Sequence, residues 1–287
     1  MMDCLISVVI PCYNCKKFIF DTLNSVYSQE CVDFEVILID DGSTDGSGDF
    51  VRNNFSNVHV YIHSDGINLG FAHSINLAVS KSKGKYIAFL DSDDLWIDKF
   101  YLFKQANNIN KTNAVLSFCN SYAIDVSGNI LWKWNSDKLY NNFDKRLILQ
   151  NCFLLTGSTM VDKLAFQRVG GMDTSLQSAD HDLWIKLAEI GDFVFLSDFM
   201  FGYRQHPNQI SQRRRQWEDG FAIIDGVKNR GFFSNEEIQK RKAVLHYRLF
   251  EHDFRHRKFF KGCFHALKAF FLDPTRALKF FFFKCIK

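Results

Sequence analysis

Short apolar runs alternate with amphipathic segments over the first 95 residues. Each run is nearly continuous and rich in β-branched residues, which is typical of strands buried on both faces. Between the runs, apolar residues recur at a spacing of three and four, which predicts helices. The predicted strands are 5–10, 34–39, 58–63 and 86–90. The predicted helices are 18–27, one that opens at 43–45 and runs through Phe55, and one that follows a turn at 68–70 and ends at Gly84.

The pattern after residue 95 is less regular. It predicts strands at 114–122, 129–134, 155–161 and 193–196, and a helix at 182–189. From about Gln216 the chain reads as helical and increasingly basic. Strict strand–helix alternation followed by mixed strands predicts an α/β fold, with a mainly parallel, Rossmann-like central sheet covered by helices on both faces. We expect one domain over 1–215, divided at residue 95, and a helical C-terminal extension over 216–287.

Two of the predicted strands end in clusters of acidic residues. Asp40 and Asp41 follow one strand, and Asp91, Asp93 and Asp94 follow another. In a parallel sheet the carboxyl ends of the strands share one edge, where ligands bind. Neighbouring carboxylates raise each other's pKa unless a cation neutralises them. Mg²⁺ and Mn²⁺ are held in this way, by one or two carboxylates together with substrate phosphates. An acidic turn that caps the next helix is the alternative interpretation.

Charge is distributed unevenly along the chain. The net charge is only +3, yet residues 240–287 carry thirteen Lys and Arg against three acidic residues. The N-terminus enters a strand almost at once, without the basic region of a signal peptide. No apolar stretch approaches the length of a transmembrane helix. We therefore expect a protein without an export signal, whose basic tail meets an anionic surface.

The last 23 residues read HALKAFFLDPTRALKFFFFKCIK. Pro274 separates two predicted short helices, and the second places Phe280–Phe283 beside Lys and Arg residues. Such a segment is typical of a helix that lies in the membrane interface and meets anionic lipid. The alternative is that these phenylalanines pack on the main domain.

Four motifs occur in order along the chain: PCYN at 11–14, DDGS at 40–43, DSDD at 91–94 and ADHDLW at 179–184. Together they resemble the family 2 glycosyltransferases with the GT-A fold, of the bacterial cell-surface polysaccharide type. The resemblance extends from about residue 7 to residue 211. It makes 1–95 the nucleotide-binding half of a catalytic domain and 96–215 the acceptor-binding half.

The resemblance implies a role for individual residues of the first three motifs. A proline and a tyrosine would lie beside the base, an aspartate would hydrogen-bond it, and a loop would lie over the nucleotide. The implied donor-binding residues are Pro11, Tyr13, Asp41, Asn68, Gly70, Asp91 and Ser92. Asp91 would face the ribose and the sugar, and Asp93 would coordinate the metal. No role follows for Asp94.

The last motif places Asp180 where the family has its catalytic base. The family often carries Glu-Asp at this position, whereas this chain has Ala179-Asp180. Aspartate is also a favoured N-cap, so a purely structural role is the alternative. The segment YRQH at 203–206 resembles the one that closes such sites, and it implies that His206 contacts the metal or the diphosphate. Arg204 and Arg213 are candidate diphosphate contacts.

The implied function is that of an inverting, metal-dependent glycosyltransferase. It would use a UDP-sugar, Mn²⁺ or Mg²⁺, and a saccharide or lipid-linked saccharide as acceptor, with no nucleic-acid partner. We expect it in the cytoplasm, at the inner face of the cell membrane. A sugar nucleotidyltransferase is one alternative, although the first loop, PCYNCKK, lacks the glycines of a phosphate-binding loop. A non-catalytic sugar- or membrane-binding module of the same fold is the other.

Overall fold

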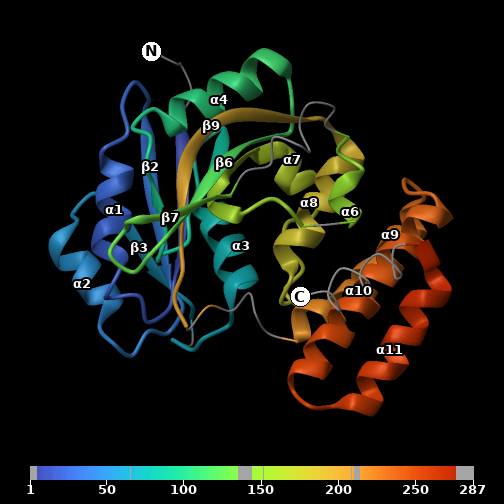
Figure 1. Ribbon diagram of the computed structural model, residues 1–287. Helices are drawn as coiled ribbons and strands as arrows, with labels where there is room; N and C mark the ends of the chain where they lie inside the picture. The colour runs from blue at the N-terminus through green and yellow to red at the C-terminus, as the bar shows by residue number, and fades with distance from the viewer. Residues whose placement is uncertain are drawn as a thin grey trace. The chain divides into compact units, whose positions relative to one another are not determined.

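The computed structural model describes residues 5–64, 66–134, 144–150, 152–207, 209 and 214–275 (Figure 1). Two compact units are distinguished. The first comprises residues 1–145, 153–175 and 179–208, and the second comprises 146–152, 176–178 and 209–287. The division of the chain at residues 95 and 215 stays a prediction.

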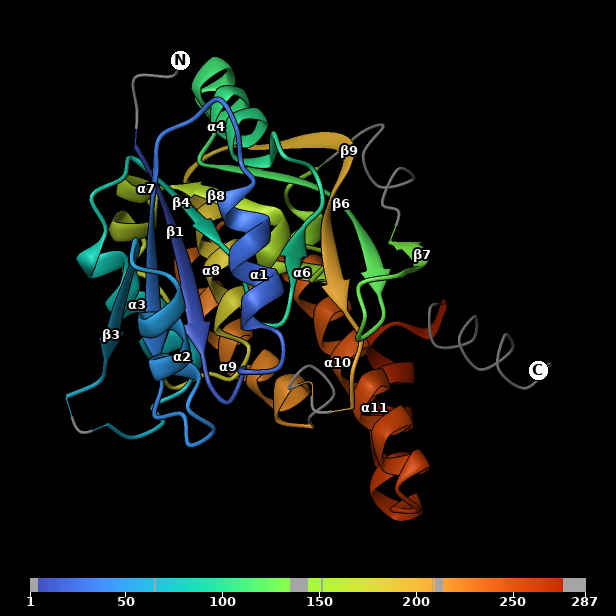
Figure 2. The same ribbon diagram turned by 90° about the vertical axis from the view of Figure 1, so that its left-hand side faces the viewer.

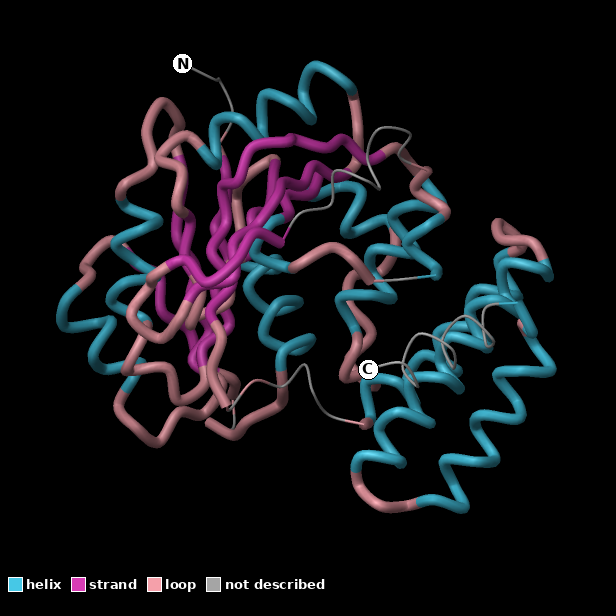
Figure 3. The backbone as a smooth tube through the Cα atoms, viewed as in Figure 1, coloured by secondary structure: helices cyan, strands magenta, loops and turns pink. Residues whose placement is uncertain are grey.

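The first unit contains a sheet and the helices that cover it (Figure 3). The strands are β1 (Ile6–Cys12), β2 (Phe34–Asp40), β3 (Val58–Ile62), β4 (Tyr86–Phe89), β5 (Leu95–Trp96), β6 (Leu116–Ile124), β7 (Ile130–Trp134), β8 (Thr159–Asp162) and β9 (Phe193–Arg204). The helices are α1 (Ile19–Tyr27), α2 (Ser47–Asn54), α3 (Phe71–Lys81), α4 (Tyr101–Thr112), α7 (Lys163–Arg168) and α8 (Ala179–Ile190).

Within the described residues the strands form a single sheet in the order β3-β2-β1-β4-β8-β6-β9-β5, and β7 pairs with β6. The first four strands are parallel, with Val8 opposite Val36 on one side and Ala88 on the other. β8 runs antiparallel to both β4 and β6, whereas β6 and β9 are parallel. The predicted α/β fold is therefore confirmed, with a parallel first half and a mixed second half.

Helices cover both faces of this sheet (Figure 2). On one face, Val8 and Ile10 pack in a core that includes Leu23 of α1 and Leu102 of α4. On the opposite face, Phe89 meets the rings of Phe166 in α7 and Trp184 in α8. Because successive side chains of a strand point to opposite faces, two covered faces require the continuous apolar runs seen in the sequence.

Several elements differ from the sequence prediction. The sequence did not indicate α4, α7 or the two-residue β5. The segment predicted as a strand from residue 155 instead begins with a 3₁₀ turn, and β8 starts at Thr159. β9 continues to Arg204, well beyond the predicted end at residue 196. α8 begins at Ala179, so Asp180 lies inside the first turn rather than before the helix.

The second unit is helical. Its elements are α6 (Leu147–Gln150), α9 (Arg215–Arg230), α10 (Asn235–Arg255) and α11 (Phe259–Leu272). α10 opens with a capping box between Ser234 and Glu237, and Arg146 pairs with the carboxylate of Glu237. The predicted second tail helix lies at 276–287, outside the described residues. Across the part of the chain that is described, no helix combines the length and the apolarity needed to cross a membrane.

Candidate active site

Three carboxylates come together where β4 ends and α8 begins. Burial, together with the negative charges of Asp93 and Asp180, raises the pKa of Asp91 to about 8. Like charges act on one another in this way only at short range in a partly desolvated setting. The structure thus brings together the predicted metal ligand and the predicted catalytic base, which lie 87 positions apart in the sequence.

Asp93 and His206 lie in direct contact. His206 Nε2 lies 2.7 Å from Asp93 Oδ2, and the two side chains are 13% and 30% exposed. At this distance the two side chains are hydrogen-bonded to each other, and both are of types that could also bind a divalent cation. Among the described residues no three acidic, His or Cys side chains are grouped to hold a metal by themselves. The remaining positions would therefore fall to donor oxygens and water.

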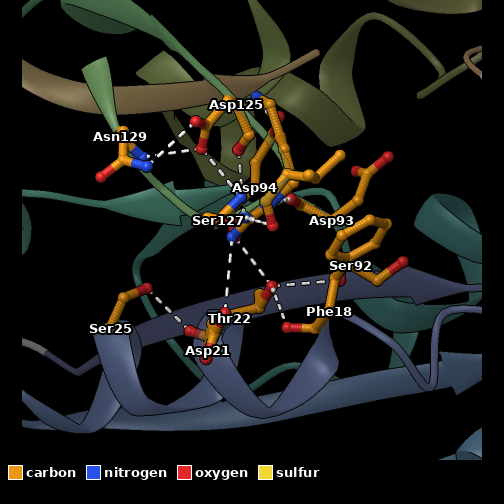
Figure 4. Close-up of polar contacts among 12 residues, drawn as sticks. Phe18, Asp21, Thr22, Ser25, Ser92, Asp93, Asp94, Asp125, Ser127 and Asn129 are labelled. Atoms are coloured by element: carbon orange, nitrogen blue, oxygen red, sulfur yellow. Dashed lines mark hydrogen bonds and ion pairs between the residues drawn. The ribbon is translucent and has the colours of Figure 1, made fainter. Parts of the chain in front are cut away.

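The backbone of the acidic loop, residues 91–94, is held from two sides (Figure 4). On one side, Thr22 Oγ1 in α1 lies 2.7 Å from the carbonyl oxygen of Asp94 and 3.0 Å from that of Ser92. On the other side, Arg204 Nε in β9 donates to the carbonyl oxygen of Asp93 at 2.6 Å. Since these bonds occupy backbone atoms, they set the direction of the Asp91 and Asp93 side chains and leave the carboxylates available to a ligand.

The Asp94 side chain is directed into the protein and not toward the place where a ligand of Asp91 and Asp93 would lie. Its side chain is 1% exposed, and Oδ1 accepts from the backbone N–H of Arg204 at 2.7 Å. Burial raises its pKa well above the ordinary value, and the charges of Asp93 and Asp91 add to this effect. Asp94 therefore attaches the acidic loop to β9.

Arg204 is enclosed by the protein, and its predicted contact with the diphosphate stays a prediction. Its side chain has no exposed surface, and its guanidinium group lies 4.9 Å from the centre of the Phe18 ring. Besides the bond to the acidic loop, Nη1 donates to the carbonyl oxygen of Val126 at 2.8 Å. A buried guanidinium that binds carbonyl oxygens of two loops is a positioning group. Arg213, the other predicted contact, lies outside the described residues.

Asp180 is placed on the first turn of α8, on the side of the sheet that carries α3 and α7. Burial is the largest influence on its pKa and raises it. The backbone N–H groups of Asp180 and His181 lower it in part, as expected at a helix N-terminus. A carboxylate with a raised pKa is a stronger base once it is deprotonated.

The loops that carry the predicted nucleotide contacts meet at the carboxyl edge of the sheet. Asn14 Oδ1 accepts from the backbone N–H of Thr44 at 2.8 Å, which joins the loop after β1 to the loop after β2. Gly42 has a φ of 76°, and a Cβ there would lie 2.9 Å from the backbone N of Asn68. Glycine is required at such a left-handed, closely packed position. Tyr13 beside these loops is 51% exposed.

Asp41 holds the loop after β3. Its Oδ1 accepts from the N–H of Leu69 at 2.7 Å, and its Oδ2 accepts from the N–H of Gly70 at 2.9 Å. His63 Nε2 lies 3.3 Å from Oδ1. The carboxylate thus orders the loop that carries Asn68 and Gly70. The hydrogen bond between Asp41 and a base stays a prediction, as do the donor contacts of Asn68, Gly70, Pro11, Tyr13, Asp91 and Ser92.

The residues that hold the acidic loop were missed at the level of sequence. Thr22 lies among apolar residues on the buried face of α1, and a polar residue on such a face was the available signal. The carbonyl oxygens of Asp125 and Val126, which accept from the Arg204 guanidinium, belong to a turn that the Asp125 side chain closes by accepting from Ser127 and Asn129. No sequence pattern could have found these backbone partners.

Comparisons with known proteins agree with this arrangement. The glycosyl transferase family 2 model matches residues 7–170. An uncharacterized glycosyltransferase of Rickettsia bellii is 32% identical over 189 residues, which cover 66% of this chain but 27% of that protein. The chain thus spans about a quarter of that relative's length. The Escherichia coli UDP-Glc:alpha-D-GlcNAc-diphosphoundecaprenol beta-1,3-glucosyltransferase WfaP is 29% identical over 213 residues, covering 73% of this chain and 81% of WfaP.

A solved structure extends the similarity to the fold. S. aureus TarS 1-349 in complex with UDP-GlcNAc superposes with a TM-score of 0.67 at 20% identity, over 95% of this chain and 82% of that chain. At this identity the likeness concerns the fold alone. The family model covers more than half of the sequence and includes the acidic loop and the strands beside it. This chain belongs to glycosyl transferase family 2.

Proposed function

We propose that this protein transfers a sugar from a nucleotide-sugar donor, a UDP-sugar, to a hydroxyl group of a saccharide, with inversion at the anomeric carbon. The observation that carries the proposal is the convergence of Asp91, Asp93 and Asp180 at one end of the sheet, with His206 against Asp93. Asp93 and His206 are suited to hold a cation that binds a diphosphate, and Asp180 is suited to act as a general base.

Asp93 and His206 would hold Mn²⁺ or Mg²⁺ against the donor diphosphate. The cation would supply stabilisation of the negative charge that develops on the leaving phosphate. Asp180 would take the proton from the acceptor hydroxyl as that oxygen attacks. A single base without a carboxylate nucleophile corresponds to direct displacement, and hence to inversion. The loops ordered by Asp41 and by the Asn14–Thr44 contact would bind the nucleotide.

The identity of the substrates rests on the relatives. WfaP is named for a UDP-Glc donor and a diphosphoundecaprenol-linked acceptor, and TarS was solved with UDP-GlcNAc. These names favour a UDP-sugar donor and a lipid-linked saccharide acceptor for this chain, in the synthesis of a surface polysaccharide. A lipid-linked acceptor would place the enzyme at the cytoplasmic face of the membrane. The tail at 276–287 would contribute to that location because its sequence is basic and would be attracted to anionic lipid.

Neither alternative function is favoured by an observation of equal weight. A nucleotidyltransferase would need a loop that cradles a triphosphate, and the loop after β1 has no glycine. A non-catalytic module would have no use for the partly buried, like-charged group of Asp91, Asp93 and Asp180, which is unfavourable without a cation.

Incubation of the full chain with Mn²⁺ and a panel of nucleotide sugars tests the proposal. We expect slow hydrolysis of a UDP-sugar, followed as release of UDP, and faster release when a lipid-linked saccharide is added. Chelation of the metal should stop both reactions. Tight binding of a nucleotide sugar without turnover, under every acceptor condition, would support the module instead.

The contacts from Thr22 predict a loss of metal affinity in Thr22→Val. This change keeps the shape of the side chain but removes the hydroxyl that holds two loop carbonyl oxygens. Leaving buried acceptors unsatisfied costs about 1–3 kcal/mol, so we expect the Mn²⁺ concentration for half-maximal activity to rise about fivefold to a hundredfold.

Thr112→Val is the matched control for Thr22→Val. Thr112 makes an equivalent hydroxyl-to-carbonyl bond of 2.7 Å, but on the exposed side of α4. Its Mn²⁺ titration should coincide with that of the unmodified protein. Equal Mn²⁺ titrations for the two valine variants would remove Thr22 from the group that positions the acidic loop.

A further inference from the structure

α11 exposes its large apolar side chains and buries its small ones. Phe260, Phe264, Leu267 and Phe271 are 97%, 53%, 60% and 78% exposed. Their spacing of four, three and four residues places them on one face of the helix. We name these four residues the α11 stripe.

The face that α11 turns toward α10 is made of small residues. Gly262 and Ala269 are the buried positions of the helix, and a Cβ on Gly262 would lie 3.6 Å from the ring of Phe250. His265 is on the same side, where its Nδ1 lies 2.9 Å from Nδ1 of His246. Figure 1 shows α10 and α11 lying side by side. A helix that needed its phenylalanines for the core would orient them toward this contact, so the α11 stripe is available to another apolar environment.

Most of the charges in the sequence around the α11 stripe are positive, although Asp273 follows Phe271 by two residues. Between Phe254 and Leu272 the chain carries Arg255, Arg257, Lys258, Lys261 and Lys268, and it contains no carboxylate. Lys268 Nζ lies 4.3 Å from the centre of the Phe264 ring. Exposed phenylalanines flanked by cations match the boundary between acyl chains and anionic headgroups.

Two other occupants fit this charge distribution poorly. A second copy would bring the same patch against itself in a twofold dimer, and it would therefore oppose five cations to five cations. The segment 276–287 adds Arg276, Lys279, Lys284 and Lys287 and no acidic residue, so it would also oppose like charges. We propose that the α11 stripe and its flanking cations form a docking surface for a bilayer of anionic phospholipid.

This inference rests on the proposed function in one respect: an acceptor attached to lipid makes docking useful. It is tested by cosedimentation of the full chain with vesicles of phosphatidylcholine and phosphatidylglycerol, and with vesicles of phosphatidylcholine alone. We expect Phe260→Ser/Phe271→Ser to lower the partition coefficient by about tenfold for each phenylalanine. Lys261→Gln/Lys268→Gln should lower the partition coefficient severalfold on vesicles that contain phosphatidylglycerol. The partition coefficient on vesicles of phosphatidylcholine alone should not change.

Leu164→Ser is the matched control, since Leu164 is 74% exposed on α7 and should not affect partitioning. Thermal unfolding and UDP release from a soluble donor should be unchanged in all these variants. Absence of UDP release from the unmodified protein, with its vesicle binding intact, would count against the proposed function and not against docking. Unchanged sedimentation of the serine variant would overturn the docking surface. Light scattering gives a second test. If the serine variant changed from a dimer to a monomer while its sedimentation with vesicles stayed the same, the docking surface would also be overturned.

Discussion

Asp180→Asn is expected to lower kcat by about a hundredfold to ten-thousandfold, the usual contribution of a general base. Asparagine keeps the size and the hydrogen-bonding shape of the side chain but cannot accept a proton at neutral pH. The affinity for the donor should hardly change, because Asp180 lies on α8 and is not one of the predicted donor contacts, which lie on the loops after β1, β2, β3 and β4. Turnover is measured as release of UDP in the presence of acceptor, and donor affinity by calorimetry with Mn²⁺.

The pH profile of the unmodified protein separates this role from a structural one. Burial raises the pKa of Asp180, and the base acts only when it is deprotonated. The rate should therefore increase with pH through a pKa above the ordinary aspartate value of about 3.9. Asp173→Asn, in an exposed turn before α8, should retain both kcat and this profile. An Asp180→Asn variant with the kcat of the unmodified protein would leave Asp180 only a structural role in the first turn of α8.

Asp93→Ala is expected to abolish the part of the donor affinity that depends on metal. Removing a group that merely orients a metal ligand costs about 10- to 100-fold in affinity, and loss of a ligand should cost at least as much. His206 alone would then face the cation, since Asp94 is directed into the protein. UDP affinity should be measured with Mn²⁺ and with a chelator, and the two values should become equal in the variant.

Asp49→Ala provides the control for that substitution. Asp49 is an exposed carboxylate on α2 that pairs with Arg52, and it is remote from the acidic loop in the sequence and on a different element. Its removal should leave the metal dependence of UDP binding intact. If the unmodified protein binds UDP equally well with and without chelator, Asp93 and His206 do not serve a metal.

Much of the first half of the fold could be predicted from the sequence, because each strand is buried on both faces and is therefore apolar throughout. β1 to β4 and the helices between them lie close to the predicted segments. α4 was missed, since its apolar residues are interrupted by Asn and Lys on the exposed side and no cap marks its start. The end of β9 was missed because its last residues read as the YRQH motif rather than as a strand.

The candidate site was predictable where it depends on side chains that follow strands. Asp91 and Asp93 were identified because they follow a strand, and Asp180 was identified from the resemblance to the family; Asp93 and Asp180 both lie close enough to Asp91 to raise its pKa. Arg204 was identified too, but with a role in which it would be exposed. A lone arginine in a sequence gives no indication of whether its guanidinium group will face solvent or backbone carbonyl oxygens.

The sequence by itself determined the parallel half of the sheet, the edge at which ligands bind and the acidic residues placed there, since strand burial and strand direction follow from local patterns. Only the tertiary structure decided how the acidic loop is held. Arg204 donates to the Asp94 side chain across 110 positions of sequence, and Thr22 donates to the Asp94 carbonyl oxygen across 72 positions. The orientation of α11, with small residues inward and phenylalanines outward, was decided in the same way. These contacts depend on which surfaces meet after folding. The sequence pattern around a residue does not identify a partner residue so far away along the chain.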